Sequence, residues 1–326
     1  MLPVAVDAMG GDHAPGSVLE GARIAVEERN IPVVLVGRSA ELDTNLEVIE
    51  ASEVIAMDAD PASSVRTMKD SSLVRAAEAV RDGNASAMVS AGNTGATMAS
   101  ALLRMGRIKG VKRPAIATPI PSPSGKPTVL LDAGANVECS PEWLVQFAQM
   151  GATYVRERFE TAHPRVALLS IGEEAGKGNA LVKSTYGLFD ELDWSTIGAQ
   201  FVGNVEGRDL MAEKADVVVT DGFTGNVALK SLEGAMTAFA TALFDALGSS
   251  PQVASAAEAL GPSLDALIAR FHPDTYGGAM LLGTRGVCII SHGASTPIAI
   301  ANAISVGAEM AEVGLVSKLE ESVAPI

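Results

Sequence analysis

The feature that most constrains this fold is the composition of the turns that end its short apolar runs. In seven places a run of strand length ends in a turn rich in Gly, Asn, Asp or Ser, and longer segments of helical pattern separate the runs. Strands that are apolar on both faces and alternate with helices form a mostly parallel sheet covered on both sides. We therefore predict a three-layer α/β/α fold. The expected strands are 4–6, 33–36, 87–90, 129–131, 166–169, 201–202, 217–220 and 287–290.

The chain is predicted to form one domain over residues 1–326. Its length allows one large domain or two ordinary ones, but no linker divides it. The Pro- and Ser-rich stretch 119–127 is interpreted as a loop or hairpin between strands.

We expect a ligand site where the seven turns meet. In parallel α/β sheets, ligands bind beyond the carboxyl ends of the strands, so the turns are expected at one edge. Glycine lets the backbone approach a ligand closely, and helix N-termini attract anions. The best predicted phosphate cradle is the turn Ser90–Gly95, with Gly92, Asn93 and Thr94 inside it. Lys177 is the first-ranked cationic contact, and His13 and His292 lie in the first and last of these loops.

Several familiar catalytic motifs are missing. No GxGxxG follows the first strand, and the segment 172–178 has one residue too few before Lys177 to be a P-loop. The sequence contains no GxSxG and no HExxH, and Cys139 and Cys288 lie in no nucleophile or zinc pattern. Such a site suits a reaction in which the bound anion is itself the nucleophile.

Charge and composition narrow the function further. A net charge of −15 argues against binding to nucleic acid. The N-terminus has no signal-peptide pattern and we find no apolar run of spanning length, so we expect a cytoplasmic protein. Residues 83–131 contain no Asp or Glu, and their basic patch either steers an acidic partner or is a solvated helix end. That patch comprises Arg104, Arg107, Lys109, Lys112 and Arg113.

A helical hairpin is predicted at about 225–275. The segment 227–247 is apolar nearly all round, residues 248–251 break it, and a second helix runs to about Phe271. An apolar hairpin of this kind is an oligomer interface or, alternatively, a membrane-surface element. Its apolar candidates are Leu232, Met236, Phe239, Leu243 and Phe244.

Six segments together resemble the phosphate acyltransferase family, the acyl-carrier-protein:phosphate transacylases of bacterial phospholipid synthesis. The resemblance runs from Val4 to about His292, and Ser170 departs from it where Asn is expected in many relatives. The segments are VAVDAMGGDHAPG, SAGNTGA, DAGAN, GNVEGRD, TDGFTGNVALK and YGGAMLLG with GVCIISHG.

This resemblance implies a specific activity. The family moves a long-chain acyl group from acyl carrier protein to inorganic phosphate, and a membrane acyltransferase uses the acyl phosphate to acylate glycerol 3-phosphate. It implies a fold similar to isocitrate and isopropylmalate dehydrogenases and to phosphotransacetylase. It also implies a homodimer peripherally associated with the inner face of the cell membrane, without a metal or cofactor. The basic patch then becomes the carrier-protein dock, and the hairpin becomes a membrane or dimer element.

The mechanism expected from this resemblance places phosphate on Gly92–Gly95, held by Lys177. Phosphate attacks the thioester carbonyl, and backbone N–H groups or the Asn226 amide stabilise the oxyanion. His13 is the best proton donor if one is needed, and Asp221 orients its loop. The further predicted binding residues are Asp7, Gly10, Gly11, Asp12, Asn136 and His292.

Three alternatives differ in class. One is a phosphotransacetylase-like enzyme that uses a coenzyme A thioester. Another is a non-catalytic membrane adaptor that binds carrier protein, although it would not need seven dense loops. A decarboxylating dehydrogenase would need a carboxylate set for a divalent metal, which we cannot assemble from the sequence.

Overall fold

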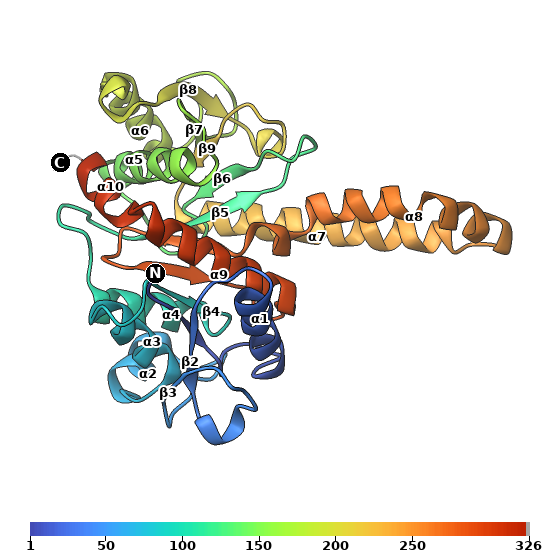
Figure 1. Ribbon diagram of the computed structural model, residues 1–326. Coiled ribbons are helices and arrows are strands. Elements are labelled where there is room, and N and C mark those ends of the chain that lie inside the picture. Colours follow the sequence, from blue (N-terminus) through green and yellow to red (C-terminus); the bar gives the residue numbers. More distant parts are fainter. Residues whose placement is uncertain (324–326) are drawn as a thin grey trace.

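The computed structural model describes residues 1–323, without the side chains at positions 251, 254, 256 and 273. It confirms a layered α/β fold built on one eleven-stranded sheet (Figure 1). The strand order is β3-β2-β1-β4-β11-β10-β5-β6-β9-β7-β8. The strands are β1 (Val4–Asp7), β2 (Val33–Gly37), β3 (Val48–Glu50), β4 (Ala87–Ser90), β5 (Ala115–Ile120), β6 (Thr128–Leu131), β7 (Arg165–Leu169), β8 (Gln200–Val205), β9 (Val217–Val219), β10 (Ala279–Leu282) and β11 (Val287–Ile290).

Helices cover both faces of this sheet. Because successive strand residues point to opposite faces, Val4 and Val6 belong to the buried cluster that includes residues of α1, α5, α9 and α10, whereas Ala5 belongs to the cluster that includes α3 and α4. The first turns of α7 lie over Leu130 and Val218 on the second face. The helices are α1 (Gly16–Glu27), α2 (Pro61–Thr67), α3 (Ser72–Arg81), α4 (Thr94–Ser100), α5 (Pro141–Arg158), α6 (Ala180–Glu191), α7 (Gly222–Leu247), α8 (Pro251–Phe271), α9 (Pro297–Glu312) and α10 (Leu315–Ser322).

The two halves of the sheet run in opposite directions. Strands β1, β2, β3, β4 and β11 are mutually parallel, as are β6, β7, β8 and β9. Antiparallel pairing of β11 with β10, of β10 with β5 and of β5 with β6 joins the halves. The expectation that all seven turns share one edge is therefore wrong. The turns after β1, β4 and β11 lie at one edge, and those after β6, β7, β8 and β9 lie at the other.

Three strands were not predicted from the sequence. β3 is short and partly exposed, and β10 is a four-residue strand next to glycines. β5 contains Pro119, which argues against a strand in the middle of a sheet. Nevertheless β5 and β6 pair antiparallel, so the hairpin interpretation is confirmed. The connecting loop covers residues 121–127 and begins two residues later than the stretch 119–127 suggested.

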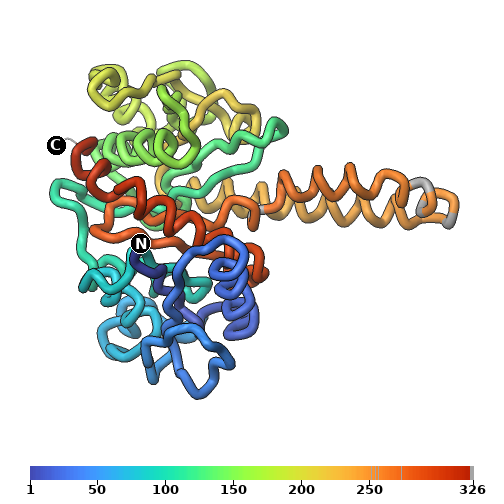
Figure 2. Tube along the Cα trace, in the orientation of Figure 1, coloured from blue at the N-terminus to red at the C-terminus, as the bar shows by residue number. Residues whose placement is uncertain are grey.

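The helical hairpin is confirmed as α7 and α8. It extends well beyond the layered body (Figures 1 and 2). In α7 only Gly222 and Gly225 are buried, and Phe239 is 71% exposed. With a mean hydropathy of 1.2, α7 is long and apolar enough to cross a membrane. This finding differs from our expectation that the chain has no apolar run of spanning length. The pair α9 and α10 passes the same test only as a helix bent by 59°.

Candidate functional site

A cavity of about 650 Å³ lies between α7 and the strands β5 and β10. It connects the two edges of the sheet, since Asn226 and Ala133 come from one edge and Thr94 and His292 from the other. Its floor is the face of β5 that carries Ile116, Thr118 and Ile120. The rest of the lining is Pro119, Pro121, Leu229, Lys230, Leu232, Glu233, Met236, Thr237, Phe271, His272, Asp274, Tyr276, Gly278, Ala279, Ile290, Ser291, Ala294 and Thr296.

The turn after β4 packs directly against the turn after β1. The Ser90 hydroxyl donates to the Asp7 carboxylate at 2.7 Å and accepts from the Gly92 N–H at 2.9 Å. A Cβ on Gly10 would lie 2.8 Å from the Gly92 nitrogen, so glycine is required for this approach. Burial raises the pKa of Asp7, although hydrogen bonds from neighbouring groups oppose that shift. Asp7 thus fixes the position of the predicted phosphate cradle through the Ser90 hydroxyl.

Asn93 caps α4 with its side chain. Its Oδ1 accepts from the Ala96 N–H at 2.9 Å, and its Nδ2 donates to the carbonyls of Met57 and Ala59. The amide is therefore engaged, and an anion at this turn would meet the backbone of Asn93 rather than its side chain. Thr94, the next residue, lines the cavity.

The last loop of this edge brings His292 to the cavity. Its Nδ1 accepts from the Ala294 N–H at 3.2 Å, which leaves Nε2 as the position for the proton of the neutral ring. The Asp12 N–H donates to the Gly293 carbonyl, and Gly11 packs against Ala91. His13 is exposed and does not line the cavity.

Asp132 is the organising residue that sequence reasoning missed. This carboxylate is fully buried and accepts from the backbone N–H groups of Ile116, Gly134, Ala135 and Asn136, at 2.7–3.2 Å. The Asn136 side chain donates to Asp132 and to the Pro114 carbonyl, so its role here is structural. Burial raises the pKa of Asp132, against the effect of these hydrogen bonds. The DAGAN motif contained this signal, because an Asp directly after a buried strand has several backbone donors in reach.

Asp221 caps α7 in a similar way. Its carboxylate accepts from the Thr224 N–H at 2.9 Å and from the Thr224 hydroxyl at 2.8 Å. Asn226, one turn further along, is exposed to the cavity and lies over Gly134. Asn226 is therefore available to a ligand, whereas Asp221 is engaged in its own helix.

Lys177 does not join the other candidates. It is exposed in the loop after β7 and does not line the cavity. Five strands lie between β4 and β7. Six steps of about 4.8 Å place the two strands about 29 Å apart across the sheet, and the two strands end at opposite edges. Within one chain, the geometry therefore corrects the predicted pairing of Lys177 with Gly92–Gly95.

The basic patch lies at the edge where β5 begins. Arg104 donates to the Val65 carbonyl and lies 3.8 Å from Glu78, and Arg107 donates to the Lys112 carbonyl. Arg113 stacks over Trp143 with its guanidinium 4.8 Å from the ring centre. Lys109 and Lys112 are exposed. Part of the patch is thus tied to the body, and the rest points to solvent.

The five hairpin candidates fall into two groups. Leu232 and Met236, near the middle of α7, line the cavity. Phe239, Leu243 and Phe244 lie beyond it, and Phe239 and Phe244 are 71% and 50% exposed.

The described residues offer no protein nucleophile of the cysteine type. Burial raises the pKa of both Cys139 and Cys288 to about 12, so neither is a thiolate at neutral pH. Within residues 1–323 no three His, Cys, Asp or Glu side chains are grouped as metal ligands.

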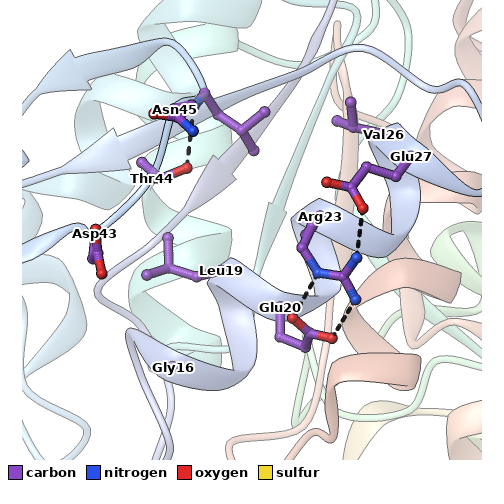
Figure 3. A pocket seen from close by; sticks show the side chains of 10 residues that line it. Gly16, Leu19, Glu20, Arg23, Val26, Glu27, Asp43, Thr44 and Asn45 are labelled. Atoms are coloured by element: carbon purple, nitrogen blue, oxygen red, sulfur yellow. Dashed lines mark hydrogen bonds and ion pairs between the residues drawn. The ribbon is translucent and has the colours of Figure 1, made fainter.

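A second hollow of about 330 Å³ lies between α1 and residues 43–46 (Figure 3). Its cation, Arg23, is held by Glu20 at 2.7 Å and by Glu27 at 2.5 Å. The charge of Arg23 is therefore already balanced by these two carboxylates.

The fold is one that solved phosphotransacetylases share. A phosphotransacetylase from Streptococcus pyogenes has the same fold, with a TM-score of 0.61 over 96% of this chain and 94% of its own, at 18% identity. The EutD phosphotransacetylase from Staphylococcus aureus gives 0.60 over 95% and 94%, at 17% identity.

The sequence comparisons identify the family. The family model described as fatty acid synthesis protein matches residues 2–318. Phosphate acyltransferases from Heliobacterium modesticaldum and Elusimicrobium minutum are both 46% identical, over 99% of this chain and 98% and 96% of theirs. The chain belongs to the phosphate acyltransferase family and is an acyltransferase.

Proposed function

We propose that this enzyme transfers a long-chain acyl group from acyl carrier protein to inorganic phosphate, yielding acyl phosphate for phosphatidic acid and phospholipid synthesis. The observation that carries the proposal is the distribution of apolar and polar side chains in the lining of the cavity. Apolar side chains such as Ile120, Leu232 and Met236 form much of the lining, which also has polar groups at Thr94, Asn226 and His292 and the Lys230–Glu233 ion pair on α7. An amphiphile with a charged head and an aliphatic tail matches this distribution.

Phosphate is the direct nucleophile in this proposal. It binds at the turn Gly92–Gly95, beside Thr94 and His292. One phosphate oxygen forms a bond to the thioester carbonyl carbon, and the resulting oxyanion accepts from the Asn226 amide or from backbone N–H groups. The carbon–sulfur bond then breaks, and the carrier protein leaves as a thiolate that takes a proton from solvent. Because a thiolate is a good leaving group, His13 and Asp221 need not act as acids.

We propose no contact between Lys177 and the phosphate at the Gly92–Gly95 turn. Its position at the opposite edge supports a role away from the Gly92–Gly95 turn. Steady-state kinetics of Lys177→Ala decide the matter, because an unchanged kcat/KM for phosphate removes Lys177 from phosphate binding.

The surroundings of the site suggest its partners. Acyl carrier protein is acidic, so exposed Lys109 and Lys112 with Arg107 and Arg113 are the proposed dock. The exposed faces of α7 and α8 are proposed to contact a second copy of the chain, the bilayer surface, or each of these along different parts. The enzyme would then work in the cytoplasm as a homodimer, peripherally bound to the inner face of the cell membrane.

The test is release of free carrier protein from palmitoyl-acyl-carrier-protein, with and without phosphate. Hydroxylamine is added to trap acyl phosphate. The proposal expects release that requires phosphate and yields trapped acyl hydroxamate. Binding of carrier protein without phosphate-dependent turnover would instead support an adaptor.

A phosphotransacetylase-like use of coenzyme A thioesters is the second candidate. The names of the solved structures with this fold favour it. The same assay with palmitoyl-coenzyme A and acetyl-coenzyme A separates the two donors. Preference for the carrier-protein thioester supports the first proposal.

A further inference from the structure

We infer that the groove between α7 and β5 holds the acyl chain of the substrate, and that the side chains at positions 232 and 236 set the longest chain accepted. This inference rests on the proposed function. The carbonyl end lies by Thr94, Asn226 and His292, and the tail runs along Leu232 and Met236 towards Phe271.

The two walls of the groove have matching apolar faces. On the strand, Ile116 and Ile120 are four residues apart and therefore point to the same face of the sheet. On the helix, Leu229, Leu232 and Met236 are spaced i, i+3 and i+7, which places them on one stripe. The strand face and the helix stripe thus form two largely apolar walls of one groove, whose lining also includes Thr118, Thr237 and the Lys230–Glu233 ion pair.

The length of the groove fits one fatty acyl chain. The residues of α7 that line it extend from Asn226 to Thr237. At 1.5 Å per residue, that segment is about 17 Å long. A bilayer core of about 30 Å contains two acyl chains end to end, so one chain spans about 15 Å. A two-carbon acyl group would leave most of this groove unfilled.

The exposure of the hairpin residues indicates the direction of the tail. Leu232 and Met236 are half-buried against the groove, whereas Phe239, less than one turn further, is 71% exposed. The lining of the groove on α7 stops at Thr237, and the exposed side chains of Phe239 and Phe244 follow further along the helix. An acyl phosphate seated this way has its tail already directed to the hairpin.

The experiment compares kcat/KM for butyryl-, octanoyl- and palmitoyl-acyl-carrier-protein in the wild type, Leu232→Trp and Met236→Trp. An indole at position 232 blocks the middle of the groove. If it expels four methylenes, at about 0.8 kcal/mol each, the palmitoyl-to-butyryl ratio falls about two hundredfold. Met236→Trp blocks the groove about 6 Å further out, so octanoyl turnover is preserved and only palmitoyl turnover falls.

The matched control is Ala238→Trp, which is exposed on the same helix, does not line the groove and lies about 200° around the helix from Met236, so it leaves the ratio unchanged. Ala279→Val narrows the groove from the sheet side and lowers the ratio independently of α7. An unchanged ratio in Leu232→Trp and Ala279→Val would overturn the inference while the proposed function stands. A stronger cut-off in Met236→Trp than in Leu232→Trp would contradict the direction of the tail. Absence of phosphate-dependent turnover in the wild type with any donor would instead refute the proposed function.

Discussion

The turn after β4 and the turn after β9 have closely similar sequences but different surroundings. Residues 90–95 are Ser-Ala-Gly-Asn-Thr-Gly, and residues 220–225 are Thr-Asp-Gly-Phe-Thr-Gly. Each turn joins a buried strand to a helix whose first turn is capped by a side chain, from Asn93 or Asp221. The strands run in opposite directions, however, so the turns lie at opposite edges of the sheet.

The glycines of these turns show how differently they are packed. A Cβ on Gly225 would lie 1.9 Å from the Asp132 carbonyl oxygen, and one on Gly222 would lie 2.6 Å from the Asn136 carbonyl oxygen. The closest atoms to Gly92 and Gly95 belong instead to side chains, Ser90 Oγ at 3.1 Å and the Pro61 ring at 2.6 Å. The turn after β9 is therefore fixed by backbone, as the base of a 26-residue helix requires. The turn after β4 is bounded at these two glycines mainly by side chains.

The largest expected effect is on Gly225. Gly225→Ala forces the backbone of β6 and α7 apart, and we expect it to lower the free energy of unfolding by more than about 3 kcal/mol. Urea unfolding measures this. Gly234→Ala is the control on the same helix, because nothing lies within 4 Å of its missing Cβ. Alanine there should be neutral or stabilising by up to about 1 kcal/mol. Equal effects at the two positions would show that the turn after β9 is not fixed by its packing.

The next effect is catalytic and falls on Asn226. Asn226→Ala removes the proposed oxyanion donor, which typically costs about 2.7–4 kcal/mol of barrier, or about 10²–10³ in kcat. Because Asn226 is exposed, its stability should change by less than about 0.5 kcal/mol. Single-turnover kinetics with palmitoyl-acyl-carrier-protein give the rate, and a loss below tenfold would assign the oxyanion to backbone donors.

A smaller effect is expected at Gly92. The added methyl group of Gly92→Ala would lie 3.1 Å from Ser90 Oγ, 3.3 Å from Asp7 Oδ2 and 3.4 Å from the Gly10 backbone, so we expect a loss of about 1 kcal/mol in the free energy of unfolding. If phosphate binds at this turn, the added methyl group raises KM for phosphate more than it lowers kcat. Initial-rate measurements with varied phosphate test this. An unchanged KM would move the phosphate away from the turn after β4.

The smallest expected effect is the pH dependence that Asp7 contributes. Burial raises the pKa of Asp7, so the folded chain holds this proton more tightly than the unfolded chain. The contribution of protonated Asp7 to the free energy of unfolding is fully present below the pKa of the unfolded chain, near 3.8. That contribution is lost as the pH rises through the pKa of Asp7 in the folded chain. The unfolding free energy of the wild type minus that of Asp7→Asn should therefore fall as the pH rises above about 4. A difference that rises instead would show that the hydrogen bonds of Ser90 and Met9 outweigh the burial.

Much of the fold could be predicted from the sequence, because buried strands and the helices between them have strong periodic patterns. The strands at 87–90 and 287–290 and the hairpin over 225–275 were predicted close to their observed bounds. The relative direction of the two halves of the sheet could not be predicted, because it depends on the strands β5 and β10, which we did not expect. Pro119 argued against β5 as a strand. Local sequence defines a turn, but only the pairing of distant strands decides which turns meet.

The same limit explains the candidate site. Thr94, Asn226 and His292 were predicted as separate turn residues and line one cavity. Lys177 was grouped with them because all the turns were expected at one edge. Asp132 was overlooked because its role depends on backbone donors from Ile116 and residues 134–136, which no side-chain pattern reveals.

The most direct test of the account is whether phosphate itself attacks the thioester. Labelled free carrier protein is incubated with unlabelled palmitoyl-acyl-carrier-protein and the enzyme, in the absence of phosphate, and label entering the acylated pool is measured. Direct attack predicts no exchange without phosphate, with exchange appearing once phosphate is added and acyl phosphate accumulates. Exchange in the absence of phosphate would show a covalent acyl-enzyme, and would contradict phosphate as the first nucleophile.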